Sequence, residues 1–304
     1  MSTRLVHEEG VHTVTDYLGY SGKVCVVTGA ASGMGKALAE ILVDLGAEVH
    51  ALDRVQSPVA GLTASIVANL GDKDSIDVAF ARLPQSIDRF FGVAGVSGVH
   101  TDFLETVTIN FIANKYIADT YLADRVVADG SLTFVTSNGG LRWDRPDVRE
   151  ETAALIHGTG WDELVGLAKG IDAEFGGIPG SLGYILSKRM LNLWVAEEAA
   201  RFADLRKIRV NALLPAMTIS GMFDEFAAMK GGREAVEADL GPAGRLAESV
   251  DMARALVFLG GDLASYVSGA HLSVDFGMNS QVLAGQAPDR TSWTLRGVLS
   301  RQPA

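Results

Sequence analysis

Cysteine is nearly absent from this sequence. Of the 304 residues only Cys25 is a cysteine, so the chain cannot form an internal disulfide, and its cysteine usage gives no sign of secretion. Cys25 lies within an apolar run, which predicts a buried thiol rather than a nucleophile. Metal-ligand spacing is lacking too, so we expect no metal site. The histidines are scattered at His7, His12, His50, His100, His157 and His271.

Basic residues are fewer than acidic ones and form no dense block. The chain has 26 lysines and arginines against 37 acidic residues, which gives a net charge of −11. Nucleic acids and anionic membranes attract concentrated positive charge, so we expect neither as a partner. No apolar run approaches a membrane span, and none follows the first residues as in a secretory signal. A cytoplasmic location is expected.

The sequence does contain an alternation of short apolar runs with helical patterns. Strands are predicted at 24–28, 48–53, 65–68, 89–93, 131–137, 208–214 and 271–274. Helices are predicted at 35–45, 73–81, 101–123, 182–203, 221–229 and 249–260. This alternation, with nearly continuous apolar strands, predicts an α/β fold in which helices cover both faces of a doubly wound parallel sheet.

Three segments fall outside this alternation. Residues 1–21 are a polar extension, and residues 278–304 are a tail without clear periodicity. Residues 142–180 are charged at first, then show helical spacing around Trp161, and end rich in glycine. That stretch is too long for an ordinary loop and predicts a functional element or an interface. We therefore predict one domain, 22–277, with a helical insertion and an extension at each end.

A glycine-rich turn follows the first predicted strand. It contains Gly29, Ser32, Gly33, Met34 and Gly35, and a helical pattern begins at once. Glycine allows the tight turn and the close approach of a phosphate to the backbone. The N–H groups of the turn and the positive end of the helix dipole favour a pyrophosphate, so the motif predicts a dinucleotide site.

A carboxylate ends the second predicted strand. Asp53 falls 18 residues after Gly35, where it suits the adenosine ribose hydroxyls and would repel a 2′-phosphate. Ser32 offers that phosphate no cation, whereas Arg54 could weaken the preference. We predict NAD rather than NADP. The alternative is that Asp53 is an ordinary solvated residue at a strand end.

Tyr184 and Lys188 lie four residues apart on one face of the predicted helix 182–203. A tyrosine titrates near pH ~10, so a base active near neutrality requires about 4 kcal/mol of phenolate stabilisation. A neighbouring ammonium in a partly dry site supplies such stabilisation. The alternative is an amphipathic helix with a buried tyrosine and an extended lysine, since the Tyr-x-x-x-Lys spacing is common by chance.

Together the motifs resemble a classical short-chain dehydrogenase/reductase, a family with a Rossmann-type fold. Its cofactor motif matches 28–35, and its catalytic tyrosine and lysine match Tyr184 and Lys188. Its catalytic serine corresponds to Ser137, and its asparagine corresponds to Asn110. Further segments match at 69–70, 94–95, 209–216, 244–245 and 275–277. The resemblance leaves out the insertion and the two extensions.

The resemblance implies a role for each matched residue. Tyr184 would exchange a proton with a secondary alcohol or ketone while hydride passes between substrate and nicotinamide, and Ser137 would bind the substrate oxygen. Lys188 would lower the Tyr184 pKa and hold the nicotinamide ribose, and Asn110 would position a water. Cofactor contacts beyond the glycine turn are expected at Asp53, Arg54, Asn69, Leu70, Ala94, Gly95, Tyr184, Lys188, Pro215, Thr218 and Ser220.

Several positions depart from the family pattern. Val93 replaces an asparagine and is expected to pack without effect on the chemistry, and Phe276 replaces a glycine where it could contact another subunit. Ser137 and Tyr184 are 47 residues apart, far more than is usual in the family. A similar insertion occurs in bacterial 3α-hydroxysteroid dehydrogenase/carbonyl reductase, a subgroup that this chain resembles more than it resembles the generic family. There the insertion covers the helix face that other members use for dimerisation, and we expect the same here.

The sequence thus predicts an NAD(H)-dependent oxidoreductase, and the family resemblance implies a homodimer or homotetramer. The expected pocket walls are 96–99, 138–143, the insertion and 219–229. The last segment is rich in methionine and phenylalanine, which favours a hydrophobic substrate that is alicyclic, steroid-like or aromatic; these side chains could equally be core or subunit contacts.

Two other functions remain as alternatives. A non-catalytic NAD-binding sensor on the same fold would usually lack Tyr184 or Lys188, both of which this chain retains. A nucleotide-sugar epimerase or dehydratase uses the same pair but usually carries a larger substrate domain, for which the stretch after Pro215 is short.

Overall fold

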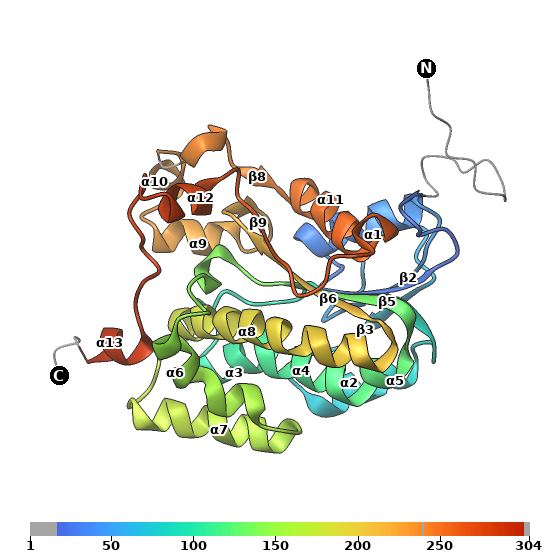
Figure 1. The fold of residues 1–304 in the computed structure, drawn as a ribbon, viewed down its shortest axis with the longest axis horizontal. Helices are drawn as coiled ribbons and strands as arrows, with labels where there is room; N and C mark the ends of the chain where they lie inside the picture. The colour runs from blue at the N-terminus through green and yellow to red at the C-terminus, as the bar shows by residue number, and fades with distance from the viewer. Residues whose placement is uncertain (1–16, 239, 301–304) are drawn as a thin grey trace.

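The computed structural model describes residues 17–238 and 240–300, and its centre is a seven-stranded parallel sheet (Figure 1). The strand order is β3-β2-β1-β4-β5-β6-β9. The strands are β1 Val24–Thr28, β2 Glu48–Asp53, β3 Ala64–Val67, β4 Ile87–Gly92, β5 Val126–Val135, β6 Arg209–Pro215 and β9 His271–Val274. All seven predicted strands are present, so the predicted doubly wound α/β fold is confirmed. The order reverses between β1 and β4, where ligands bind in such sheets.

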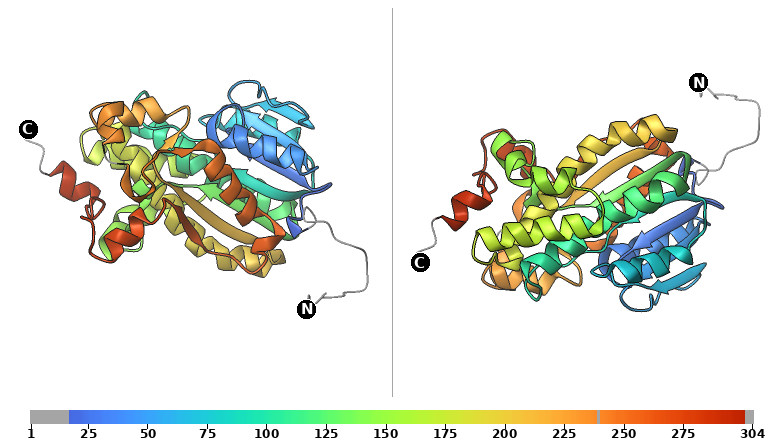
Figure 2. Two further views of the ribbon diagram at one scale, coloured as in Figure 1. Left: turned by 90° about the horizontal axis from the view of Figure 1, so that it is seen from above. Right: turned by 90° about the horizontal axis from the view of Figure 1, so that it is seen from below.

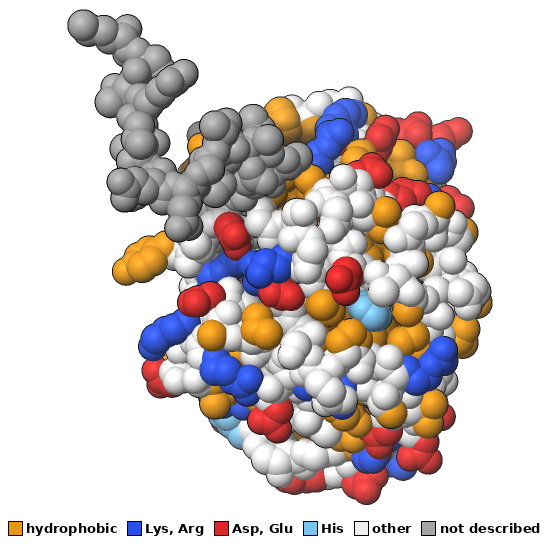
Figure 3. Space-filling view, turned by 90° about the vertical axis from the view of Figure 1, so that its right-hand side faces the viewer, with side chains coloured by type: hydrophobic (Ala, Val, Ile, Leu, Met, Phe, Trp, Pro, Cys, Tyr) orange, Lys and Arg blue, Asp and Glu red, His pale blue; other side chains and the backbone are white. Residues whose placement is uncertain are grey.

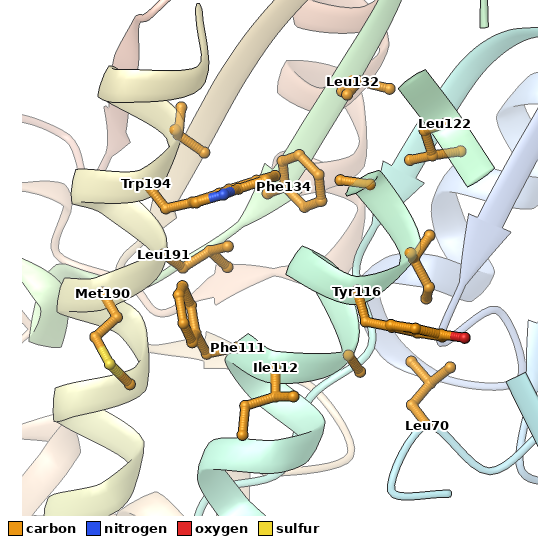
Figure 4. Close-up of a cluster of buried hydrophobic side chains, with 14 of the residues drawn as sticks. Leu70, Phe111, Ile112, Tyr116, Leu122, Leu132, Phe134, Met190, Leu191 and Trp194 are labelled. Atoms are coloured by element: carbon orange, nitrogen blue, oxygen red, sulfur yellow. The ribbon is translucent and has the colours of Figure 1, made fainter. Parts of the chain in front are cut away.

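Helices cover both faces of the sheet, and Figure 2 shows the two sides in turn. On one face lie α1 (Gly33–Asp44) and α11 (Ser249–Gly260), which pack against each other. On the other face lie α2 (Lys73–Ala81), the helical run 103–125 and α8 (Gly180–Arg206). Side chains of α8 interlock with that run and with β5; the Phe134 and Trp194 rings, for example, meet edge to face at 5.2 Å (Figure 4).

The helix predicted at 101–123 is interrupted twice by π-helical turns. The run consists of α3 Phe103–Val107, a π turn Thr108–Ile112, α4 Ala113–Ile117, a second π turn Ala118–Leu122 and α5 Ala123–Arg125. The first π turn contains Asn110. A π turn inserts one extra residue into the helical ladder, so it changes where a side chain points without altering the apolar periodicity.

The insertion forms two helices, α6 (Pro146–His157) and α7 (Trp161–Glu174). The helical spacing around Trp161 predicts α7, whereas no sequence pattern predicts α6. Helix α6 packs on α8, and α7 packs on α3; the Trp161 ring at the start of α7 also lies 5.5 Å from the ring of Tyr116 on α4. The insertion therefore covers the outer side of α3 and α8.

The C-terminal tail is more ordered than its sequence indicates. It contains α12 (Met278–Leu283) and α13 (Leu295–Leu299), and Leu295 is buried in the main core beside the insertion. Near the cavities described below lie α9 Phe223–Met229, α10 Arg233–Glu237 and a two-stranded sheet of β7 Thr218–Ile219 and β8 Ala247–Glu248. Single 3₁₀ turns occur at Asn138–Gly140, Gly241–Ala243 and Asp262–Ala264.

The surface carries mixed charge. On the face shown in Figure 3, lysine and arginine side chains lie interspersed with acidic and apolar ones. Within residues 17–238 and 240–300, no helix has both the length and the apolar character needed to cross a membrane. Residues 17–21 are the described part of the predicted extension 1–21. Tyr20 in this part is fully buried and donates a hydrogen bond to the Val257 carbonyl at 2.8 Å, so this part packs on the domain.

Candidate active site

The glycine-rich turn carries the chain from β1 into α1 through conformations that favour glycine. Gly29 and Gly33 have φ angles of +72° and +53°. A Cβ at Gly35 would lie 2.2 Å from the Gly29 carbonyl oxygen, so this close crossing of the chain tolerates no side chain. The hydroxyl of Thr28 accepts hydrogen bonds from the N–H groups of Val93 and Ala94 and ties the turn to β4.

Asp53 lies at the end of β2, beside this turn. One carboxylate oxygen accepts a hydrogen bond from the Ala31 N–H at 2.9 Å, and the other faces the Val55 N–H at 3.4 Å. Asp53 is therefore not an ordinary solvated residue, because it also fixes the glycine-rich turn. Arg54, which follows it, is exposed. Asn69 uses its side-chain oxygen within its own loop, where it accepts from the Gly71 N–H.

Two adjoining cavities, of about 690 and 700 Å³, lie along the carboxyl ends of the strands. The second cavity is lined by the predicted cofactor residues Gly29, Ser32, Gly33, Met34, Gly35, Asp53, Arg54, Asn69, Leu70, Ala94 and Gly95. The first is lined by Ser137, Tyr184, Lys188, Pro215, Thr218 and Ser220. The glycine turn lies where the two cavities adjoin, because Met34 lines both, and this place suits the pyrophosphate in the middle of an extended dinucleotide.

Ser137, Tyr184 and Lys188 meet in the first cavity although the serine follows β5 and the other two lie on α8. Tyr184 and Lys188 are one turn apart on α8, with the lysine Nζ 5.7 Å from the tyrosine ring centre. The same Nζ donates to the Val135 carbonyl, at the end of β5, at 2.9 Å. Ser137 follows β5, and its hydroxyl accepts from the Gly139 N–H at 3.0 Å.

Asn110 lines neither cavity and is fully buried behind the site. Its side chain accepts from the Val96 N–H at 2.9 Å and donates to the Val96 carbonyl at 3.0 Å. Gly95 lies between Asn110 and Lys188: a Cβ there would be 3.0 Å from the asparagine oxygen and 3.5 Å from the lysine Nζ. Asn110 therefore shapes the backbone that separates it from the lysine.

Burial dominates the protonation of the pair on α8. It raises the pKa of Tyr184 to about 12, and the hydrogen bond with Ser137 is the contact that lowers it. Burial also lowers the pKa of Lys188 to about 8. In this structure the serine hydroxyl opposes the cost of a buried phenolate, while the lysine ammonium lies near the tyrosine ring and donates to the Val135 carbonyl.

The walls of the first cavity differ in part from the prediction. Met217, Met222, Phe226 and Met229 line it as the apolar pattern suggested, and the Phe226 ring lies 5.1 Å from that of Tyr184. None of residues 142–180 lines it, because the insertion packs on the far side of α8. The stretch 96–98 lines the second cavity instead. No sequence pattern pointed to the lining residues Val236, Leu246 and Met278, whereas Asp275 belongs to the segment 275–277 that matches the family.

Three further predictions can be located in the structure. Cys25 is buried, and burial raises its pKa to about 12, so it is a core thiol as predicted. Val93 is buried and packs in the core beside α1. Phe276, with φ of +53°, is 74% exposed next to the first cavity.

Comparisons with known proteins agree with this geometry. Residues 23–141 match the short chain dehydrogenase model, and residues 168–279 match the model described as enoyl-(acyl carrier protein) reductase. The coniferyl-alcohol dehydrogenase of Pseudomonas sp. (strain HR199) is 27% identical over 264 residues, which cover 86% of this chain and 98% of that protein. The 3-alpha-hydroxysteroid dehydrogenase/carbonyl reductase of Comamonas testosteroni is 26% identical over 260 residues, covering 84% and 96%.

A solved structure extends the similarity to three dimensions. The 3-alpha-hydroxysteroid dehydrogenase from Pseudomonas sp. B-0831, complexed with NADH, has a TM-score of 0.71 and 25% identity, and the match covers 87% of this chain and all of that one. The two family models bracket most of the insertion, as the sequence resemblance did. The chain therefore belongs to the short-chain dehydrogenase/reductase family of oxidoreductases, which act on CH–OH groups and their carbonyl counterparts.

Proposed function

We propose that this protein is an NAD(H)-dependent enzyme that interconverts a hydrophobic secondary alcohol and its ketone. The observation that carries the proposal is the meeting of Ser137, Tyr184 and Lys188 in a largely apolar cavity that adjoins the cavity lined by the glycine turn. Relatives named for coniferyl alcohol, cyclohexanol and hydroxysteroid substrates support the alicyclic, steroid-like or aromatic class.

The residues of the site divide the chemistry between them. A bound nicotinamide supplies the hydride acceptor or donor. Tyr184 takes the hydroxyl proton of the alcohol during oxidation and returns it during reduction. Ser137 donates a hydrogen bond to the reacting oxygen and stabilises its developing charge. Lys188 holds the nicotinamide ribose, and Asn110 helps to position a water that links the lysine to solvent.

The same cavities argue for NAD over NADP. Asp53 lies at the ribose end of the second cavity, where its carboxylate suits ribose hydroxyls and repels a 2′-phosphate. Arg54 is next to it and exposed, so the preference rests on Asp53. Remaining cofactor contacts follow from the lining of the two cavities, with Pro215, Thr218 and Ser220 at the nicotinamide end.

The direct test follows NADH absorbance with purified protein, NAD and a panel of cyclic and aromatic secondary alcohols. Turnover that Tyr184→Phe lacks would support the enzyme. NADH binding without turnover across the panel would favour the alternative of a non-catalytic sensor. Conversion of a nucleotide sugar without net change in NADH would favour the epimerase alternative. Replacing NAD by NADP in the same assay tests the cofactor preference.

We further propose that the protein is a cytoplasmic homodimer or homotetramer. Because α6 and α7 cover the outer side of α3 and α8, the contact between copies has to use another surface, and the exposed Phe276 is a candidate contact. Light scattering after size-exclusion chromatography would give the mass of the assembly. A monomer at the working concentration would contradict this proposal, and fractionation of the native cells would test the location.

A further inference from the structure

The buried carboxylate of Asp275 reaches from the C-terminal part of the chain to the catalytic serine turn. It directly follows β9 and is 7% exposed. One oxygen accepts from the Gly277 N–H at 3.0 Å; the other accepts from the Asn279 N–H at 2.9 Å and from the side-chain amide of Asn138 at 3.2 Å. Asn138 is the residue after Ser137, so a carboxylate outside the predicted site restrains the turn that carries the serine.

The serine turn, residues 137–140, is held from its other side by α8. The Asn192 side chain donates to the Gly140 carbonyl at 3.0 Å, and a Cβ on Gly140 would lie 2.8 Å from the Lys188 carbonyl oxygen. The turn is thus fitted between Asp275 and the helix that carries Tyr184.

The chain beyond Asp275 braces the same two elements. We call residues 275–299 the C-terminal arm; in Figure 1 it runs from α12 past α6 to α13. Asp289 accepts from the Arg142 Nε at 2.6 Å, just after the serine turn. The carbonyls of Thr291 and Trp293 accept from Arg189 at 2.7 and 2.8 Å, just after Lys188 on α8.

The buried side chain of Arg189 anchors the C-terminal arm to α8. The side chain is 1% exposed, and its guanidinium lies 4.3 Å from the centre of the Trp293 ring. A buried cation needs polar partners, so detaching the arm would leave Arg189 without these two carbonyls. The arm therefore links the end of β5 to α8, the two elements whose spacing sets the contact between Ser137 and Tyr184.

We propose that Asp275 is a positioning residue, which acts through Asn138 to hold the Ser137 hydroxyl in place against Tyr184, with the C-terminal arm as its support. The inference rests on the proposed function, since it concerns the geometry of that site. Misplacing a catalytic group by about 1 Å costs up to roughly 10²-fold in rate, so a modest shift of the turn has a measurable effect.

The test compares Asn138→Ala, Asp275→Asn and the exchanged pair Asn138→Asp/Asp275→Asn. The two single variants are expected to lower kcat about tenfold, which is about 1.4 kcal/mol of barrier, with little change in NADH affinity. The acid limb of the pH profile should move to higher pH, because Ser137 no longer stabilises the phenolate. The exchanged pair restores a carboxylate–amide hydrogen bond at unchanged net charge and should recover most of kcat.

Glu174→Gln is the matched control. This substitution removes an exposed ion pair in which Arg296 of the C-terminal arm lies 2.8 Å from Glu174 of α7, and neither residue lines a cavity. This variant should keep the wild-type kcat and pH profile. Equal losses in the control and in Asp275→Asn would overturn the proposal, because general loosening of the arm would then explain both. Wild-type kcat and pH profile in both single variants would overturn it too.

Hydrogen exchange separates this inference from the proposed function. The N–H groups of Gly139 and Gly140 bond to Ser137, so their exchange reports on the turn whether or not a substrate is known. Faster exchange there in Asn138→Ala, but not in Glu174→Gln, supports the positioning role even if no alcohol is turned over. Unchanged exchange refutes it. Asn138→Ala leaves the bonds from Asp275 to its own segment intact, so it decides the question if Asp275→Asn fails to fold.

Discussion

Replacing Ser137 by alanine tests the electrostatic reasoning about the site most directly. The hydrogen bond with Ser137 is the contact that lowers the pKa of Tyr184, against burial that raises it to about 12. A hydrogen bond to a charged group contributes about 1.5–3 kcal/mol, and this equals roughly 1–2 pKa units. A base acts only when deprotonated. The acid limb of kcat/KM for alcohol oxidation in Ser137→Ala should therefore move to higher pH by about 1–2 units.

The rate should fall further than this shift explains. Ser137 is also the proposed donor to the reacting oxygen, and the loss of one such donor costs about 10²–10³ in kcat. The assay is the pH dependence of NADH formation, together with NADH affinity from fluorescence quenching. Affinity is expected to stay close to wild type, because Ser137 lies at the substrate end of the opening.

Ser131→Ala is the matched control for this experiment. Ser131 lies on β5, the strand that Ser137 follows; it is fully buried and donates to the Gly260 carbonyl at 2.9 Å, away from both cavities. It should leave the pH profile unchanged. A limb that stays in place in Ser137→Ala, or moves to lower pH, would refute the assignment of Ser137 as the group that stabilises the phenolate.

Three further outcomes are expected. Asp53→Ala should reduce the preference for NADH over NADPH by roughly 10–100-fold in calorimetric titrations, because a charged acceptor worth about 1.5–3 kcal/mol is lost; an unchanged ratio would count against ribose contact. Gly35→Ala should lower the melting temperature and abolish NADH binding, because its Cβ would lie 2.2 Å from the Gly29 carbonyl oxygen. Gly166→Ala is the contrasting variant: open space surrounds this position in α7, so the free energy of unfolding should rise by up to about 1 kcal/mol. Lys188→Met should abolish turnover yet raise the free energy of unfolding by up to about 3 kcal/mol near neutral pH. Burial lowers the folded-state pKa of Lys188 to about 8, so the buried ammonium destabilises the folded wild-type protein fully below that pH. This destabilisation disappears above the unfolded-state pKa of about 10.4. Chemical denaturation at several pH values should therefore show the gain in stability of Lys188→Met decreasing as the pH rises.

Local signals explain why much of the fold and site could be predicted from the sequence. A strand, a glycine-rich turn and a helix follow one another directly in residues 24–44, so a single short segment contains the whole motif of the dinucleotide site. Tyr184 and Lys188 are one helical turn apart, and helix geometry alone puts them on one face. Ser137 ends a buried strand, and the carboxyl ends of parallel strands gather at one edge of the sheet.

The elements that were missed lack such local signals. The π turn at Asn110 shifts the hydrogen-bond ladder by one residue, which apolar periodicity does not register. Helix α6 is polar on most of its surface, and its burial comes from contact with α8, distant in sequence. Helix α13 has five residues and is stable through tertiary contacts: the carboxylate of Glu151 accepts from the N–H groups of Leu295 and Arg296.

The support of the catalytic helix illustrates a deeper reason. Arg189 is held by the carbonyl oxygens of Thr291 and Trp293, and a carbonyl is available at every residue. Such a contact restricts the path of the backbone but leaves the residue type at that position almost free, so it produces no sequence motif. The residues that touch substrate need particular chemistry and are visible in the sequence. Contacts with backbone carbonyls, such as those that hold Arg189, leave no such signal, and for that reason this part of the arm's role emerges from the structure alone.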